Sequence, residues 1–203
     1  MPATTPLLLK RARALALLLV PLGVPLLTAA AQPFALAPAA ASFAASQAAA
    51  AKSRGSLVEI VRNATARYRD LNVALAEGWV PATPCVSGPD HGAMGVHFVL
   101  PARIGDGLVN AEQPEALIYE PLSNGAMRLV GVEFIVIADD WARVNPGAGP
   151  PALDGNLMNL VGAPNRYGLP SFYELHVWAW EHNPSGSFAD WNTDVSCEHQ
   201  PTG

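Results

Sequence analysis

Apolar residues recur at helical spacing in the first well-patterned segment of the chain, residues 56–77. They fall three or four positions apart at Leu57, Ile60, Val61, Ala64, Tyr68, Leu71 and Leu75. This spacing puts the apolar side chains on one face of an α-helix. Ser56 can cap that helix, Glu59 completes a capping box, and Gly78 can end it. The pattern therefore predicts one amphipathic helix over residues 56–77.

After Trp79 the pattern changes to short apolar runs separated by proline, glycine and asparagine. These runs predict strands at residues 95–100, 116–120, 127–137 and 172–181. Asn124-Gly125, between the second and third runs, is typical of a tight hairpin turn. Residues 141–170 predict a long loop with a short helix near residues 157–161. The expected fold class is α+β, with one N-terminal amphipathic helix packed on a mainly antiparallel sheet or small barrel.

The N-terminus has the pattern of a secretory signal peptide. A basic stretch at residues 10–13 is followed by an apolar run at residues 14–27 and by small residues up to Ala31. This order is typical of a cleaved leader. A retained transmembrane anchor is the alternative, but spanning a bilayer needs about 20 mostly apolar residues. The run is shorter than that and contains two prolines, so cleavage is favoured.

Three segments follow from this pattern. Residues 1–31 are the predicted signal peptide. Residues 32–55 are rich in alanine and proline without a periodic apolar face, so they are expected to be a flexible spacer. Residues 56–203 are then a single globular domain, secreted or periplasmic, whose length suits one hydrophobic core.

The charge argues against a nucleic-acid partner. The chain has 12 Lys and Arg against 17 Asp and Glu. Loss of residues 1–31 removes three basic residues and no acidic one, which leaves nine against 17 and a formal net charge of −8. Binding to phosphates needs a basic face. With no stable membrane anchor after cleavage, the partners left open are a small ligand or a second copy of the chain.

Two cysteines, Cys85 and Cys197, lie 112 positions apart. An exported chain meets an oxidising compartment, where an even pair usually forms a bridge. Two buried free thiols are the alternative. We expect a Cys85–Cys197 disulfide.

The run at residues 172–181 is the most informative strand. Side chains alternate between the two faces of a strand, and neighbours on one face lie about 6.6 Å apart. One face would therefore carry Glu174, His176, Trp178 and Trp180. Two polar groups beside two indoles are unusual for a solvent face, and Glu174 and His176 can converge on one ion or one substrate group.

Two other strands each offer one residue to that face. His97 alternates with apolar neighbours in its strand, and Glu133 does so in another. If the faces meet, His97, His176, Glu174 and Glu133 form a transition-metal site suited to zinc, iron or manganese, and Met94 would favour copper. Binding should then weaken as the pH falls through about 6.5, the ordinary histidine pKa. The alternative is that these residues are ordinary hydrogen-bonded polar groups.

Three functions are compatible with these residues. The first is an exported binding domain with a cleft between helix and sheet, whose candidate lining is Trp178, Trp180, Tyr119 and Phe134. The second is a metal-dependent enzyme that uses the His and Glu set with an open coordination position. The third is a structural or assembly domain whose aromatic strand meets another subunit.

Several stretches together resemble an uncharacterised family of exported bacterial proteins. They are ATARYRD at 64–70, CVSGP at 85–89, GAMGVH at 92–97, RLVGVE at 128–133, YELHVWAW at 173–180 and NPSGSF at 183–188, running on to Cys197. The resemblance covers nearly all of residues 56–198. It implies one structural unit in a bacterial secreted context and transfers no mechanism.

Overall fold

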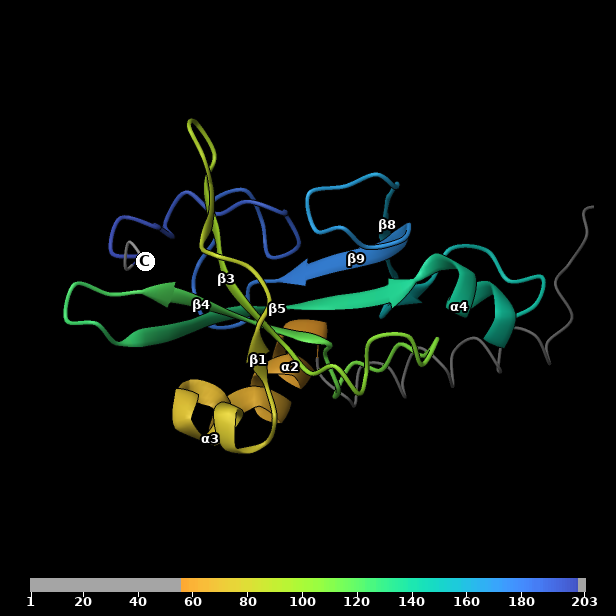
Figure 1. The fold of residues 1–203 in the computed structure, drawn as a ribbon, viewed down its shortest axis with the longest axis horizontal. Coiled ribbons are helices and arrows are strands. Elements are labelled where there is room, and N and C mark those ends of the chain that lie inside the picture. Colours follow the sequence, from red (N-terminus) through yellow and green to blue (C-terminus); the bar gives the residue numbers. More distant parts are fainter. Residues whose placement is uncertain (1–55, 201–203) are drawn as a thin grey trace, which may run out of the picture. The chain divides into compact units, whose positions relative to one another are not determined.

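The alternating apolar runs fold into one antiparallel sheet, which is the centre of the structure (Figure 1). The computed structural model describes residues 56–200, so the predicted signal peptide (1–31) and spacer (32–55) lie outside the described residues. The seven-stranded sheet contains β1 (Val80–Pro81), β2 (Val86–Gly88), β3 (Gly92–Val99), β4 (Ala116–Pro121), β5 (Met127–Ile137), β8 (Asn159–Val161) and β9 (Phe172–Val177). Its order is β1-β3-β4-β5-β9-β8, and β2 also pairs with β3. The predicted α+β class is confirmed.

The segment predicted as a single helix over residues 56–77 forms three shorter pieces. They are α2 (Leu57–Thr65), the 3₁₀-helix η1 (Ala66–Arg69) and α3 (Leu71–Ala76). The predicted capping box is present at the start of α2. The prediction of one continuous helix is wrong because Asp70 is extended and caps α3 with its own side chain. Tyr119 of β4 donates its hydroxyl to the Tyr68 carbonyl at 2.6 Å, so the break also ties the helices to the sheet.

β4 and β5 form a hairpin whose register contains one bulge. Ile118 pairs with Gly131 and Tyr119 pairs with Leu129, so Val130 is the extra residue. The bulge changes which side chains of β5 face the helices. Before it, Leu129 packs in the helix-side core; after it, Val132 and Phe134 do. Glu133 is thereby directed to the opposite face of the sheet.

The helices cover one face of the sheet with a continuous apolar core. Leu57 and Val61 of α2 pack with Leu117, Phe134 and Val177 from three strands, and all five are buried. The opposite face carries two smaller apolar clusters. One is centred on Ile118 and Trp178, and the other on Ile135 and Phe172.

The region between β5 and β9 differs from its prediction. It contains α4 (Ala138–Val144) and the short strands β6 (Ala152–Leu153), β7 (Asn156–Leu157) and β8. Residues 157–161 therefore lie mainly in strands and not in a helix. β8 pairs with β9, which supplies hydrogen bonds that a local sequence pattern does not reveal. No helix within residues 56–200 has the length and apolar character needed to cross a bilayer.

Candidate metal centre

Two histidines and a glutamate meet on the face of the sheet that the helices leave uncovered. They are His97 of β3, Glu133 of β5 and His176 of β9. Glu133 pairs directly with His176 across β5 and β9. His97 lies one strand further away, beyond β4, where Ala116 is the partner of Glu133. The β4 partner of His97 is Ile118, two residues from Ala116, so His97 and Glu133 approach each other diagonally across β4.

The three side chains are close enough to share one ion. His97 Nε2 lies 3.3 Å from Glu133 Oε2. The rings of His97 and His176 are edge-to-face, with centroids 5.8 Å apart. Each of the three residues offers one ligand atom, and these atoms all lie within 4.8 Å of one another. All three side chains are buried, so the arrangement is set by the fold.

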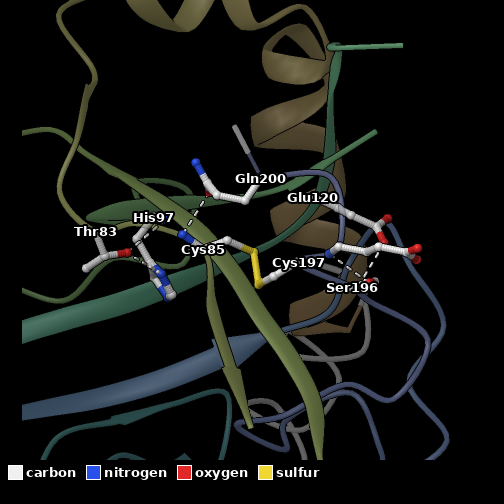
Figure 2. Close-up of a disulfide and its surroundings, with 8 residues drawn as sticks. Thr83, Cys85, His97, Glu120, Ser196, Cys197 and Gln200 are labelled. Atoms are coloured by element: carbon white, nitrogen blue, oxygen red, sulfur yellow. Dashed lines mark hydrogen bonds between the residues drawn. A yellow bond between two sulfur atoms is a disulfide. The ribbon is translucent and has the colours of Figure 1, made fainter. Parts of the chain in front are cut away.

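Thr83 holds the His97 ring in place, as Figure 2 shows. Its hydroxyl oxygen accepts the backbone N–H of His97 at 3.4 Å and lies 3.3 Å from Nδ1 of the ring. When Nδ1 carries the ring proton, the lone pair of Nε2 is left facing Glu133. A hydrogen bond at the other ring nitrogen is the usual way in which proteins orient a metal-binding histidine.

His176 is buried without a hydrogen-bond partner at either ring nitrogen. Its Nδ1 lies 3.8 Å from Oδ1 of Asp190, which is too long for a hydrogen bond. The ring stacks against Trp178, with centroids 6.3 Å apart. A side chain 1% exposed with two unpaired polar atoms is rare in a folded protein.

Burial disfavours charge on the side chains of this site. It lowers the pKa of His97 to about 4 and the pKa of His176 to about 3, so both imidazoles are neutral at pH 7. Burial, followed by the nearby Glu174 carboxyl, raises the pKa of Glu133 well above its ordinary value. The histidines are therefore ready to coordinate a metal. The proton that competes with a metal belongs to Glu133, and not to a histidine of ordinary pKa as the sequence suggested.

A second group of possible ligands shares His176. It consists of Glu174 of β9, His176 and Asp190, again with ligand atoms within 4.8 Å of one another. Burial raises the pKa of Glu174 and of Asp190. Glu174 thus shares His176 with the three-residue cluster, and its carboxyl contributes to the raised pKa of Glu133. Of the four residues proposed from the sequence, His97, Glu133 and His176 form one group of possible ligands, and Glu174 belongs to the second group through His176.

Asp190 is the residue that the sequence did not single out. It lies in the loop after β9, which Trp178 fastens to the sheet. The Trp178 backbone N–H donates to the Ser187 carbonyl, and its indole N–H donates to the Ala189 carbonyl. These tertiary contacts place Asp190, and no periodic pattern around it could have indicated this.

A cavity of about 490 Å³ opens beside the cluster. His97 and Glu133 form part of its wall, together with Thr83. Tyr167 also lines it, and the Tyr167 hydroxyl lies 3.9 Å from the sulfur of Met94. The cavity lies on the cluster's face of the sheet, away from the helix-side core.

The lining proposed for a cleft between helix and sheet needs correction. Tyr119 and Phe134 are fully buried in the helix-side core, and Trp178 is buried on the opposite face. Trp180 does not share the face of His176, because β9 ends at Val177 and not at residue 181. Trp180 turns to the helix side, where its indole N–H donates to Thr65 Oγ1 at 3.0 Å.

The predicted Cys85–Cys197 disulfide is confirmed. Figure 2 shows it close to the segment that carries Thr83. The Cys85 backbone N–H donates to the side-chain carbonyl of Gln200 at 2.9 Å, which is a second tie between this segment and the C-terminal region. The crosslink thus fastens the strand-edge segment whose Thr83 orients His97.

No protein-family model, curated protein sequence or solved structure matches the chain.

Proposed function

We propose that the domain binds one divalent transition-metal ion, with zinc as the first candidate, through His97, Glu133 and His176. The observation that supports this most strongly is His176, whose two ring nitrogens are buried and unpaired beside two other ligand side chains. A structural role for the cluster would call for hydrogen bonds at these nitrogens. Metal coordination gives one of them the partner that it lacks.

A structural role and a metal-binding role for the cluster differ in the cost of its unpaired polar atoms. A buried polar atom without a partner costs about 1–3 kcal/mol. Three such atoms occur in the cluster: Nε2 of His97 and both ring nitrogens of His176. A proton on Glu133 can satisfy His97 across the 3.3 Å gap, but it leaves His176 unpaired. Binding of an ion by Nε2 of His97, one nitrogen of His176 and the Glu133 carboxylate would offset this cost.

The ligand chemistry favours zinc or iron. Two imidazoles and one carboxylate are the protein ligands of catalytic zinc sites of the His₂Glu type and of non-haem iron(II) sites. Such sets leave at least one coordination position open. The Glu174 carboxyl contributes to the raised pKa of Glu133, and in its protonated form it would orient the Glu133 ligand from outside.

The proposal places this domain outside the cytoplasm, as an exported bacterial protein. Support comes from the disulfide, since such bridges persist in oxidising compartments. The basic, apolar and small-residue order at residues 10–31 gives independent support. N-terminal sequencing of secreted protein should begin at or near Gln32. Material that begins at residue 1 or 2 would contradict export with cleavage.

The test of metal binding compares two histidines in the same protein. Purified wild type, stripped of metal and titrated with Zn²⁺, should bind one equivalent that survives gel filtration. His176→Ala should lose this equivalent. His182→Ala is the matched control, because the His182 side chain is 78% exposed, and it should keep the metal. Equal zinc content in both variants, or none in the wild type, would contradict the proposal.

A further inference from the structure

We propose that the cavity beside the metal centre binds a small molecule with an apolar body and one anionic oxygen head, which coordinates the ion. The inference rests on the proposed metal site and adds its ligand class. The cavity measures about 490 Å³, within the range of about 300–1,000 Å³ that is usual for small-molecule sites.

The position of the cavity relative to the ligand residues gives the orientation. His97 and Glu133 belong to the cavity wall, whereas His176 lies outside it. An ion held among the three side chains would thus have protein behind it at His176 and the cavity on the side of His97 and Glu133. The open coordination position would be reached from the cavity, so the ligand's head group would lie at that end.

The walls determine the body of the ligand. Beyond the polar end they are lined by the side chains of Val99, Ile104, Ile135, Leu169 and Phe172. All five side chains belong to the same apolar cluster. Ligand sites of this kind bind apolar bodies, with a few polar groups to fix the orientation. A body about the size of an aromatic ring fits this lining.

The charges near the cavity determine the head group. A divalent ion with one Glu133 carboxylate and two neutral imidazoles has a local charge of about +1, which an anionic oxygen neutralises. The other charged residue of the wall is Arg166, which is exposed and therefore lies at the mouth. The metal ion and the Arg166 guanidinium both favour an anionic ligand over an amine. Weak acids with an apolar body are therefore the ligand class that fits the apolar lining, the metal ion and Arg166.

The test uses two hydroxamates that share one metal-coordinating head. Benzohydroxamate carries a phenyl ring and acetohydroxamate carries a methyl group. The full chain as exported is loaded with Zn²⁺, its metal content is measured first, and the two affinities are then compared by calorimetry. Burial of the ring predicts that benzohydroxamate binds at least about tenfold more tightly.

A pocket-filling variant shows where the ring binds. Ala82 is exposed and lines the cavity, so Ala82→Trp should fill it without disturbing the core. This variant should keep zinc and lose the preference for benzohydroxamate. Ala142→Trp is the matched control, since Ala142 is exposed on α4 and lies outside the cavity wall, and it should keep the preference.

The outcomes separate the two proposals. Zinc binding with equal affinity for the two hydroxamates would overturn the ligand assignment and leave the metal site standing. The same holds if Ala82→Trp keeps zinc and the preference for the phenyl ring. Failure of the wild type to bind zinc would overturn both the metal site and the ligand class.

Discussion

The helix-covered face of the sheet is lined with apolar side chains, whereas the opposite face carries buried histidines and carboxylates between two apolar clusters. The same strands supply both faces. In β5, Phe134 packs under the helices while its neighbour Glu133 lies in the candidate metal centre. In β9, Leu175 packs in the helix-side core and His176 lies in the candidate metal centre. Strand alternation therefore lets one sheet stabilise the domain on one face and place reactive groups on the other.

The two faces also differ in how most of their polar atoms are satisfied, although Trp79 Nε1 in the helix-side core is buried without a partner as well. On the helix side, the Tyr119 hydroxyl and the Trp180 indole each donate a hydrogen bond to the helical segments. On the opposite face, the ring nitrogens of His176 have no partner. Substitutions in the helix-covered core should therefore lower the unfolding free energy, whereas those in the candidate metal centre should change metal binding and the pH dependence of stability.

The largest effect is expected from the helix-side core. Phe134 is fully buried there, and Phe134→Ala removes the packing of a whole ring. Such substitutions cost about 3–5 kcal/mol of unfolding free energy. Urea denaturation of the metal-free protein measures this cost. A loss below about 1 kcal/mol would show that the helix-covered face is not the main source of stability.

The second-largest effect is the gain in unfolding free energy when zinc binds the face opposite the helices. Zn²⁺ at about 100 times its dissociation constant should raise the unfolding free energy of the wild type by about 2.7 kcal/mol, because the ion binds only the folded state. His176→Ala should gain nothing from zinc. Thermal denaturation with and without zinc measures both values. An equal gain in the variant would place the bound zinc elsewhere.

Acid should destabilise the metal-free protein through its buried histidines. Their pKa values are about 4 for His97 and about 3 for His176 in the fold, against about 6.5 in the unfolded chain. Between these values the unfolded state binds more protons at the two histidines, so the histidine contribution to stability falls as the pH drops below about 6.5.

Removal of His176 should make this loss smaller. From pH 7 to 4.5, the wild type should lose about 2 kcal/mol more than His176→Ala, since one pKa unit corresponds to about 1.4 kcal/mol. Burial raises the pKa of Glu115 to about 8 and also raises the pKa values of Glu133, Glu174 and Asp190. These carboxyls act in the opposite direction, because the stability they contribute is lost as the pH rises above their ordinary values. Both proteins keep all four carboxyls, so the difference between the two pH profiles reports His176. If the unfolding free energies of wild type and His176→Ala change equally with pH, His176 is not buried in its neutral form.

The smallest effect is expected from the residue that orients His97. Thr83→Val keeps the shape of the side chain and removes the hydroxyl beside Nδ1. Loss of such an outer partner typically weakens metal binding about 10- to 100-fold. Thr83→Ser keeps the hydroxyl and should retain most of the affinity. Equal zinc affinities for the two variants would show that the hydroxyl does not position His97.

The sequence predicted the parts of the site that lie inside long strands. His97, Glu133 and His176 occupy strands whose alternation is regular next to them, so the side of the sheet on which each lies could be inferred from period two. That the three strands meet depends on the order β3-β4-β5-β9. Only the hairpin between β4 and β5 had a local signal, at Asn124-Gly125.

The parts that the sequence missed depend on tertiary contacts. Asp190 and Tyr167 reach the site from loops, and loop paths have no periodic signal. Trp180 was placed on the wrong face because β9 ends at Val177, after which the Trp178 backbone N–H bonds to the Ser187 carbonyl. The helical segment was predicted as continuous because Asp70 fits a helix by spacing, while its capping role depends on the local conformation.

Anomalous diffraction from crystals of the zinc-loaded protein, recorded at the zinc absorption edge, locates the bound ion itself. One strong peak is expected on the sheet face opposite the helices. It should lie about 2.0–2.1 Å from Nε2 of His97 and from one nitrogen of His176, and about 2.0–2.2 Å from a Glu133 oxygen. A crystal in which zinc occupies only exposed side chains such as His182, with His97 and His176 free of metal, would contradict the proposed metal centre.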